Sequence, residues 1–271
     1  MRLQGHGAIG VFDSGVGGLT VLRALMARLP FESTVYLGDT ARVPYGSKSP
    51  EVVTRYSVAN ARFLLSRDIK LLVVACNTAS AVGLEALAQE LPVPVIGVIE
   101  PGARVAARCT RSGKVGVIGT MGTVRSGAYQ RALEALRPDV EVKSRPCPLF
   151  VPLAEEGWTQ GEVPRLVAQA YLAELARSGV DTLVLGCTHY PLLRGVIAEV
   201  MGPDVVLVDS AEAVAEAVDQ TLREANALAG PSATPVHRYY VTDVPHRFVE
   251  VAPRFLGREV ADAEQVDIRP A

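Results

Sequence analysis

Leu71-Leu-Val-Val-Ala-Cys-Asn-Thr78 begins with five apolar residues and ends in a thiol, an amide and a hydroxyl. An apolar run without polar alternation is typical of a strand that is covered on both faces, as in a parallel sheet. The residues that follow, 79–90, have the apolar spacing of a helix. This stretch therefore predicts a buried strand that delivers polar side chains to the start of a helix.

The same pattern recurs in the second half of the chain. Thr182-Leu-Val-Leu-Gly-Cys-Thr-His189 is again an apolar run that ends in a thiol and polar groups. In addition, Ile9-Gly-Val-Phe-Asp-Ser-Gly15 is similar to Val115-Gly-Val-Ile-Gly-Thr-Met121. Two matches in the same order predict two related α/β halves, and chance similarity of buried strands is the alternative.

If the halves are related, Cys76 and Cys187 occupy equivalent strand ends. The carboxyl ends of parallel strands and the surfaces between domains are favoured places for ligands. Two halves that face each other would set one thiol on each side of a shared cleft. The sequence thus predicts an active site in the cleft between two domains.

The remaining chain alternates short apolar runs with longer helical patterns. This alternation predicts an α/β fold in which mostly parallel sheets are flanked by helices. The expected strands are residues 7–12, 34–37, 70–75, 93–98, 114–118, 140–143, 182–185, 205–208 and 237–241, and the expected helices are residues 19–28, 52–66, 79–90, 124–136, 164–177 and 211–224.

The composition narrows the class of protein. The chain has 271 residues, a formal net charge of −2 and no basic tract, which argues against nucleic acid as a partner. No apolar stretch approaches the roughly 20 residues of a membrane span, so no membrane partner is expected. The N-terminus lacks the apolar core of a signal peptide, and we expect a cytoplasmic location with four reduced cysteines.

A thiol at the start of a helix lies beside free backbone N–H groups and the positive end of the helix dipole. Both favour a thiolate, so the pKa of a thiol placed there is expected to fall below about 8.5. The alternative is that Cys76 and Cys187 are small buried apolar residues. Cys109 and Cys147 have no such setting, and we expect both to be structural.

Other chemistries have weaker support. Cys187 and His189 are separated by one residue, and the chain has no Cys-x-x-Cys or His-x-x-x-His, so a metal site is not expected. A nucleophilic cysteine activated by His189, as in cysteine hydrolases, is also less favoured, because such a nucleophile would not require a second matched cysteine. Asp13-Ser-Gly-Val-Gly-Gly18 lacks both the G-x-G-x-x-G spacing and the lysine of a phosphate loop. It does place a carboxylate and a hydroxyl at the end of the first strand.

Four short blocks stand out when they are taken together. They are Asp13-Ser-Gly-Val-Gly-Gly18, Val43-Pro-Tyr-Gly46, Ala75-Cys-Asn-Thr-Ala79 and Gly186-Cys-Thr-His-Tyr-Pro191. In this order the blocks resemble those of the bacterial glutamate racemases, in the aspartate/glutamate racemase superfamily. The similarity runs from about residue 9 to residue 219.

The resemblance implies a cofactor-independent enzyme that interconverts L- and D-glutamate and supplies D-glutamate for peptidoglycan. It implies two pseudo-symmetric α/β domains, the first formed by residues 1–98 and 210–271 and the second by residues 99–209. Glutamate is the implied partner, no metal or cofactor is implied, and a homodimer is left open.

The same resemblance assigns roles to residues. Cys76 and Cys187 are implied to be the two bases that act on opposite faces of the substrate. Asp13 is implied to assist Cys76, whereas Glu155 and His189 are implied to assist Cys187. The implied substrate-binding residues are Asp13, Ser14, Tyr45, Gly46, Asn77, Thr78, Thr120, Thr188 and His189.

Some assignments stay open at this point. Glu156 adjoins Glu155, so either carboxylate could assist Cys187, and Thr123 is a further candidate near the substrate. A two-lobed binding protein is an alternative, although it would gain nothing from opposed thiols. A related aspartate or hydantoin racemase or a decarboxylase is another. The family pattern favours glutamate, since aspartate racemases tend to have an acidic residue where His189 stands and the decarboxylases lack one cysteine.

Overall fold

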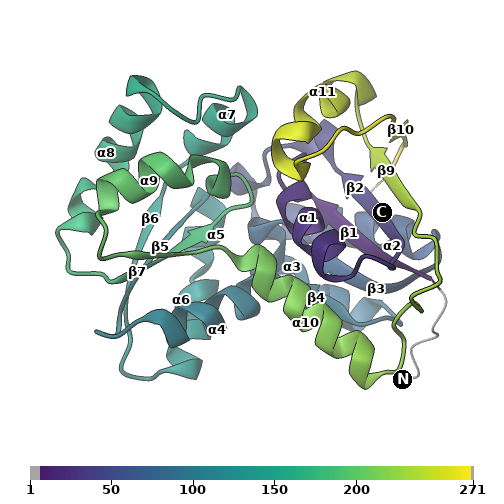
Figure 1. Ribbon diagram of the computed structural model, residues 1–271, viewed down its shortest axis with the longest axis horizontal. Coiled ribbons are helices and arrows are strands. Elements are labelled where there is room, and N and C mark those ends of the chain that lie inside the picture. The colour runs from purple at the N-terminus through teal and green to yellow at the C-terminus, as the bar shows by residue number, and fades with distance from the viewer. Residues whose placement is uncertain (1–6, 270–271) are drawn as a thin grey trace.

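The computed structural model describes residues 7–269, and two parallel sheets form its framework (Figure 1). Within these residues the first sheet has the order β10-β9-β2-β1-β3-β4 and the second the order β6-β5-β7-β8. The strands are β1 (Ala8–Asp13), β2 (Thr34–Gly38), β3 (Ile69–Val74), β4 (Val95–Gly97), β5 (Lys114–Gly119), β6 (Glu141–Pro146), β7 (Thr182–Gly186), β8 (Val206–Val208), β9 (His237–Val241) and β10 (Glu264–Gln265).

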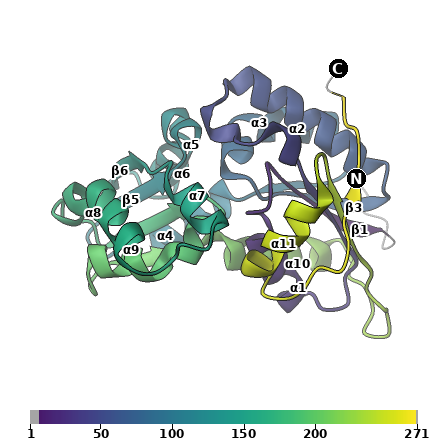
Figure 2. The same ribbon diagram turned by 90° about the horizontal axis from the view of Figure 1, so that it is seen from above.

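Helices cover both faces of each sheet, as Figure 2 shows for the first sheet, where α2 and α3 lie on one face and α1, α10 and α11 on the other. Alternate residues of a central strand therefore enter different cores: Leu72 packs with one cluster and Leu71 with the other. The helices are α1 (Leu19–Arg28), α2 (Pro50–Leu65), α3 (Asn77–Glu90), α4 (Ile99–Cys109), α5 (Met121–Ser126), α6 (Ala128–Leu136), α7 (Phe150–Glu155), α8 (Glu162–Ala176), α9 (Arg194–Met201), α10 (Ser210–Glu224) and α11 (Pro245–Leu256), with 3₁₀ turns η1 (Thr40–Arg42), η2 (Tyr45–Ser47) and η3 (Tyr190–Leu193).

The predicted repeat is visible in the topology. The order β2-β1-β3-β4 in the first sheet corresponds to β6-β5-β7-β8 in the second, and all of these neighbours pair in parallel. The two sequence matches fall on β1 and β5 and on β3 and β7. The predicted fold class, two pseudo-symmetric α/β units with parallel sheets flanked by helices, is therefore confirmed.

We call the six-stranded sheet with α1, α2, α3, α10 and α11 the first lobe, and the four-stranded sheet with α4 to α9 the second lobe. The chain returns to the first lobe at its end, because β9 pairs with β2 and α11 packs on α1. The division of the chain at residues 98/99 and 209/210 stays a prediction. A membrane span needs about 20 apolar residues, and no helix within residues 7–269 meets that requirement.

Some sequence predictions of the elements were wrong. The helix expected at residues 124–136 is two helices, because Gly127 adopts a left-handed conformation with φ of 64° between α5 and α6. Only glycine enters this region of conformational space without a steric cost. The expected helices also left out α4, α7, α9 and α11, and β10 was missed. Proline residues inside α7 and α11, Pro152 and Pro253, obscure the helical pattern there.

A buried ion pair fastens the returning chain to the first lobe. The ammonium of Lys70 lies 2.7 Å from a carboxylate oxygen of Glu32, and both side chains are almost fully buried. Lys70 also donates to the carbonyl of Ala227, and Glu32 accepts from the N–H of Ala229. The pair therefore holds the segment between α10 and β9 against the amino-terminal edge of the sheet.

We expect Lys70→Met to destabilise the protein by about 3–5 kcal/mol, because it leaves the carboxylate of Glu32 buried without its cation. Urea unfolding of the purified variant measures this change. The double variant Lys70→Met/Glu32→Leu should recover much of the loss, since it removes both charges. A single variant as stable as the wild type would show that the pair does not fasten this segment.

Candidate active site

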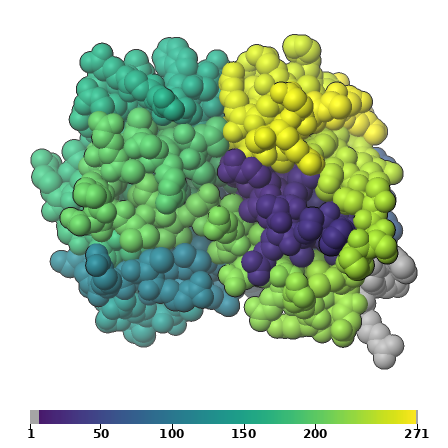
Figure 3. All heavy atoms as spheres, viewed as in Figure 1, coloured from purple at the N-terminus to yellow at the C-terminus, as the bar shows by residue number. Residues whose placement is uncertain are grey.

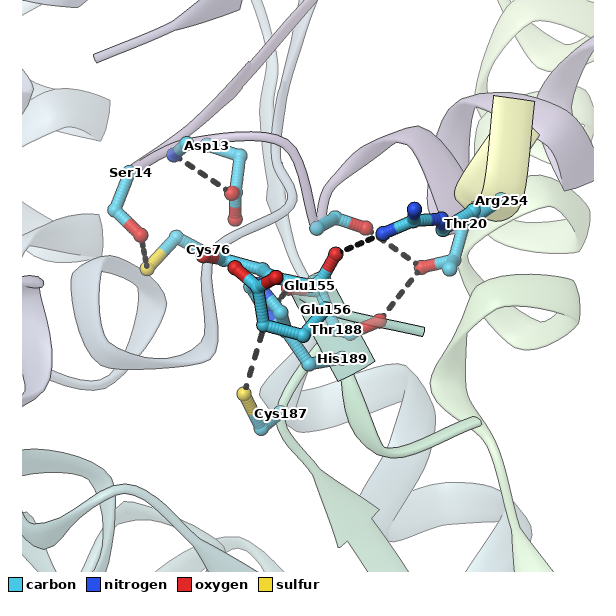
Figure 4. A network of polar contacts seen from close by, with 12 residues as sticks. Asp13, Ser14, Thr20, Cys76, Glu155, Glu156, Cys187, Thr188, His189 and Arg254 are labelled. Atoms are coloured by element: carbon cyan, nitrogen blue, oxygen red, sulfur yellow. Dashed lines mark hydrogen bonds and ion pairs between the residues drawn. The ribbon is translucent and has the colours of Figure 1, made fainter. Parts of the chain in front are cut away.

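Three strand ends of the two sheets bring the predicted residues together (Figure 4). Asp13 is the last residue of β1, Cys76 follows β3 as the N-cap of α3, and Cys187 follows β7. The first two lie in the first lobe and Cys187 in the second. Both cysteines are only 6% exposed, so the lobes close over them.

The surroundings of Cys76 are neutral or acidic. Its thiol donates to the hydroxyl of Ser14, with 3.7 Å between sulfur and oxygen. Asp13 is fully buried, and one of its oxygens accepts from the N–H of Gly15 at 2.9 Å. The other, Oδ1, has no hydrogen-bond partner among residues 7–269. Asp13 therefore keeps a free acceptor beside the thiol.

The prediction of a lowered thiol pKa is wrong for Cys76. Burial, followed by the nearby charge of Asp13, raises the pKa of Cys76 to about 12. The N–H of Ala79 at the start of α3 and the hydroxyl of Ser14 act in the opposite direction, but their effect is smaller. Burial also raises the pKa of Asp13. Cys76 is thus a thiol at neutral pH.

The surroundings of Cys187 differ. The sequence suggested that an α-helix starts directly after Cys187, and this is wrong. A turn and η3 come first, and α9 begins at Arg194. Its neighbour is His189, whose Nδ1 lies 3.8 Å from the sulfur and whose Nε2 lies 2.9 Å from Oε1 of Glu155. We call Glu155, His189 and Cys187 the relay.

His189 carries a positive charge in this arrangement. Burial lowers its pKa, but hydrogen bonds with Cys187 and Glu155 outweigh burial and raise the pKa to about 10. The two carboxylates left open by the sequence are now distinguished. Glu155 contacts His189, whereas Glu156 forms an ion pair with Arg247 at 2.7 Å.

Hydroxyl groups join the lobes on the other side of the site. The hydroxyl of Thr78 lies 2.9 Å from that of Thr120 and 3.2 Å from that of Thr123. Gly46 lies against Thr120, since a Cβ on Gly46 would be 2.5 Å from Cβ of Thr120. All of these were candidates from the sequence, and the structure brings them together at the lobe boundary.

Tyr45 takes a less direct position. Its side chain is 1% exposed, and its hydroxyl donates to the buried carboxylate of Asp39. Asn60 donates to that hydroxyl at 3.0 Å. The hydroxyl of Tyr45 is therefore committed to the interior of the first lobe, and the loop that holds Gly46 is anchored through it.

Sequence reasoning missed several residues that support the site. The hydroxyl of Tyr129, on α6, donates to the side-chain oxygen of Asn77 at 2.7 Å. The hydroxyl of Thr20 approaches the carbonyl oxygens of Gly17 and Thr188 at 3.0 and 3.2 Å. These residues stand in ordinary helical patterns, and nothing in the sequence marks them as contacts between lobes.

A cavity of about 360 Å³ lies at the mouth of the site, lined by Val16 and Phe248 of the first lobe and by Glu155 of the second. It offers a path from solvent toward the relay. Within residues 7–269, no three His, Cys, Asp or Glu side chains gather closely enough to hold a metal ion.

Comparison with known proteins adds to this geometry. The profile of the family described as Asp/Glu/Hydantoin racemase matches residues 9–218. The chain is 62% identical over 261 residues to the glutamate racemase of Geobacter metallireducens. This alignment covers 96% of this chain and 97% of that protein.

Solved structures of glutamate racemases have a similar fold. A glutamate racemase isoform of Bacillus anthracis superposes with a TM-score of 0.93 at 42% identity, and the glutamate racemase of Francisella tularensis in complex with D-glutamate with 0.91 at 38%. Both alignments cover 97% of this chain and 98% of the other. These likenesses make the protein an amino-acid racemase. Within that class, the chain belongs to the Asp/Glu/Hydantoin racemase family.

The close contact between the lobes at Gly17 can be tested. A Cβ at this position would lie 2.3 Å from Oγ1 of Thr188 and 2.5 Å from Cε1 of His189. Gly17→Ala should therefore force the lobes apart and lower kcat/KM by about 100-fold, as misplaced catalytic groups do. Gly195→Ala is the control, because a Cβ there meets no heavy atom within 4 Å. Equal activity of both variants would contradict the contact.

The raised pKa of Cys76 can also be tested. Only the thiolate reacts with iodoacetamide, so at pH 7 a thiol with a pKa of about 12 should react on the order of 1000-fold more slowly than an unperturbed one. Its rate should still rise through pH 10, where that of glutathione has levelled off. Mass spectrometry of the peptide that contains Cys76 gives the rate. A plateau below pH 9 would contradict the raised pKa.

Proposed function

We propose that this protein interconverts L- and D-glutamate without a cofactor, with Cys76 and Cys187 as the two bases. The observation that carries the proposal is the pair of buried thiols at equivalent strand ends of opposite lobes. The relatives support the substrate, since the 62%-identical protein is a glutamate racemase and one similar structure contains D-glutamate.

Two thiols account for the proton transfers. One sulfur starts as a thiolate and takes the α-proton from one face, while the electron pair stays on Cα and its carboxylate. The other sulfur starts as a thiol and donates its proton to the opposite face. The enzyme ends with the protonation of the two sulfurs exchanged, which is the state that the opposite enantiomer requires. We assign Cys76 to D-glutamate and Cys187 to L-glutamate.

Asp13 explains how a thiolate forms at Cys76. Its free oxygen, Oδ1, is a buried acceptor suited to the α-ammonium group of the substrate. A cation bound there offsets the negative charge of Asp13, which is one of the causes that raise the pKa of Cys76. Substrate binding then favours proton loss from Cys76, and the thiol stays protonated when no substrate is present.

The relay serves the other face. A protonated His189 can donate from Nδ1 to the sulfur of Cys187, and it donates from Nε2 to Glu155. Such a charge-assisted hydrogen bond would stabilise the negative charge on the sulfur once it has given up its proton. The carboxylate of Glu155 in turn compensates the buried imidazolium.

The α-carboxylate of the substrate fits the start of α3. Helix N-termini present N–H groups to anions, and Asn77 and Thr78 are the first residues of this helix. Thr120 faces Thr78 from the second lobe, and Ser14 and Thr188 are the further substrate-binding residues that we propose. Hydrogen bonds here would stabilise the negative charge that moves onto the carboxylate in the transition state.

The wider role follows from the product. We propose that the D-glutamate supplies peptidoglycan synthesis and that the enzyme works in the cytoplasm, where its free thiols stay reduced. Its oligomeric state, with a homodimer as one option, is to be measured by light scattering.

Replacing either thiol should abolish inversion. In deuterated water the wild type should place deuterium at Cα of the inverted product. We expect Cys76→Ala and Cys187→Ala to show at most slow exchange without inversion, each for one enantiomer only and for opposite ones. Proton NMR and chiral chromatography measure the two processes.

Cys109→Ala is the matched control, since Cys109 lies on α4 away from the site. It should racemise glutamate at the wild-type rate. If a folded Cys76→Ala or Cys187→Ala variant did the same, the two-base mechanism would be wrong.

Comparable wild-type turnover of alanine or glutamine would argue against glutamate as the specific substrate, because a site that pairs a charged group rejects analogues without it.

A further inference from the structure

Helix α11 reaches the relay from the opposite lobe. The ring of Phe255 lies edge-to-face with that of His189, with 5.2 Å between centroids and 77° between planes. Phe255 is fully buried, so this contact excludes water from one side of the imidazole. α11 lies beyond residues 9–218, which the family profile matches.

The preceding residue contacts the other end of the relay. Arg254 donates from its guanidinium to the backbone carbonyl of Glu155, as Figure 4 shows. Glu155 is the last residue of α7, and the final carbonyls of a helix have no partner within the helix. A cation from the first lobe therefore caps the helix that presents the Glu155 carboxylate.

Glu155 and His189 can assist Cys187 only in one orientation of their side chains. The side chain of Glu155 is 31% exposed, and α7 is only six residues long. His189 must keep one nitrogen toward Cys187 and the other toward Glu155, and rotation of the ring would break both contacts. Figure 3 shows the C-terminal segment, in yellow, directly against the second lobe, in teal.

We propose that Phe255 and Arg254 are positioning residues of the racemase: Phe255 fixes the ring of His189, and Arg254 fixes α7 and thereby Glu155. The second lobe thus supplies Cys187, and the first lobe aligns the groups that assist it. This inference rests on the proposed function, because the relay has a catalytic role only if Cys187 transfers a proton.

The site has a second contact between α11 and α7 that serves as an internal control. Arg247 pairs with the carboxylate of Glu156, and both side chains are more than half exposed. This ion pair links α11 to the residue that follows α7 and lies at the rim of the same cavity. Within residues 7–269, neither of its two side chains forms a hydrogen bond or ion pair with a member of the relay. If α11 acted only by holding the lobes together, loss of either arginine would have the same effect.

The experiment measures kcat and KM for L- and D-glutamate in purified, folded variants. We expect Phe255→Leu and Arg254→Met each to lower kcat about tenfold, because they misalign groups of the relay, and to change KM less than twofold. Arg254→Lys should recover part of the loss, since an ammonium can still donate to the Glu155 carbonyl. The fall in kcat/KM must be equal in both directions, because the equilibrium constant between enantiomers is unity.

Two controls separate positioning from stability. Phe63, on α2, packs edge-to-face on Tyr240 with 5.2 Å between ring centroids and 76° between planes, which is nearly the geometry of Phe255 on His189. Phe63→Leu removes this ring. Arg247→Met removes the ion pair at the rim. Both should keep kcat within twofold of the wild type, while urea unfolding reports the stability of every variant.

The outcomes are distinct. The proposal is overturned if Phe255→Leu and Arg254→Met keep wild-type kcat, or if Arg247→Met loses as much activity as Arg254→Met. A wild type that fails to racemise glutamate would instead refute the proposed function. If Phe63→Leu also lost kcat in proportion to its stability, the effect of Phe255 would be structural.

Discussion

In the mechanism that we propose, a base on each face of one carbon atom is the constraint on which the structure depends. A single parallel sheet gathers its functional residues along one edge, at the carboxyl ends of its strands. Such an edge can approach a substrate from one side only. Two sheets of equivalent topology place Cys76 and Cys187 at equivalent strand ends of opposite lobes. The repeated topology therefore supplies the geometry that the proposed two-base chemistry requires.

The repeat makes the backbone similar in the two lobes but leaves the electrostatics different. Cys76 lies beside Asp13, a buried acid that disfavours its thiolate, whereas Cys187 lies beside His189, a cation held by Glu155. Groups whose surroundings differ in this way do not lose their protons together. The asymmetry thus suits a reaction in which one sulfur must be a thiolate while the other is a thiol. In the proposed mechanism the ammonium group of the substrate completes the balance, because its binding to Asp13 would change the charge near Cys76 only.

Sequence reasoning could find what each segment specifies locally. Buried strands and the polar residues that end them are properties of short stretches, and this is why the sheets and the places of Cys76 and Cys187 at strand ends were predicted correctly. Contacts between segments far apart leave no such signal. Tyr129 and Thr20 stand in ordinary helical patterns, and only the closed lobes show that they reach across to Asn77 and Thr188. The choice between adjacent carboxylates was open for the same reason.

The pKa of Cys76 illustrates a further limit. A helix N-terminus favours a thiolate, and the sequence shows the helix; it does not show how deeply the sulfur is buried or that Asp13 lies beside it. Burial is a result of how the two lobes close, and residues as far along the chain as α11 take part in the contacts between the lobes. Because the end of the chain returns to the first lobe, its last helix can reach across the boundary to α7 and His189. The two lobes are therefore in contact at the site through α11 as well as through the hydroxyl groups of Thr78 and Thr120.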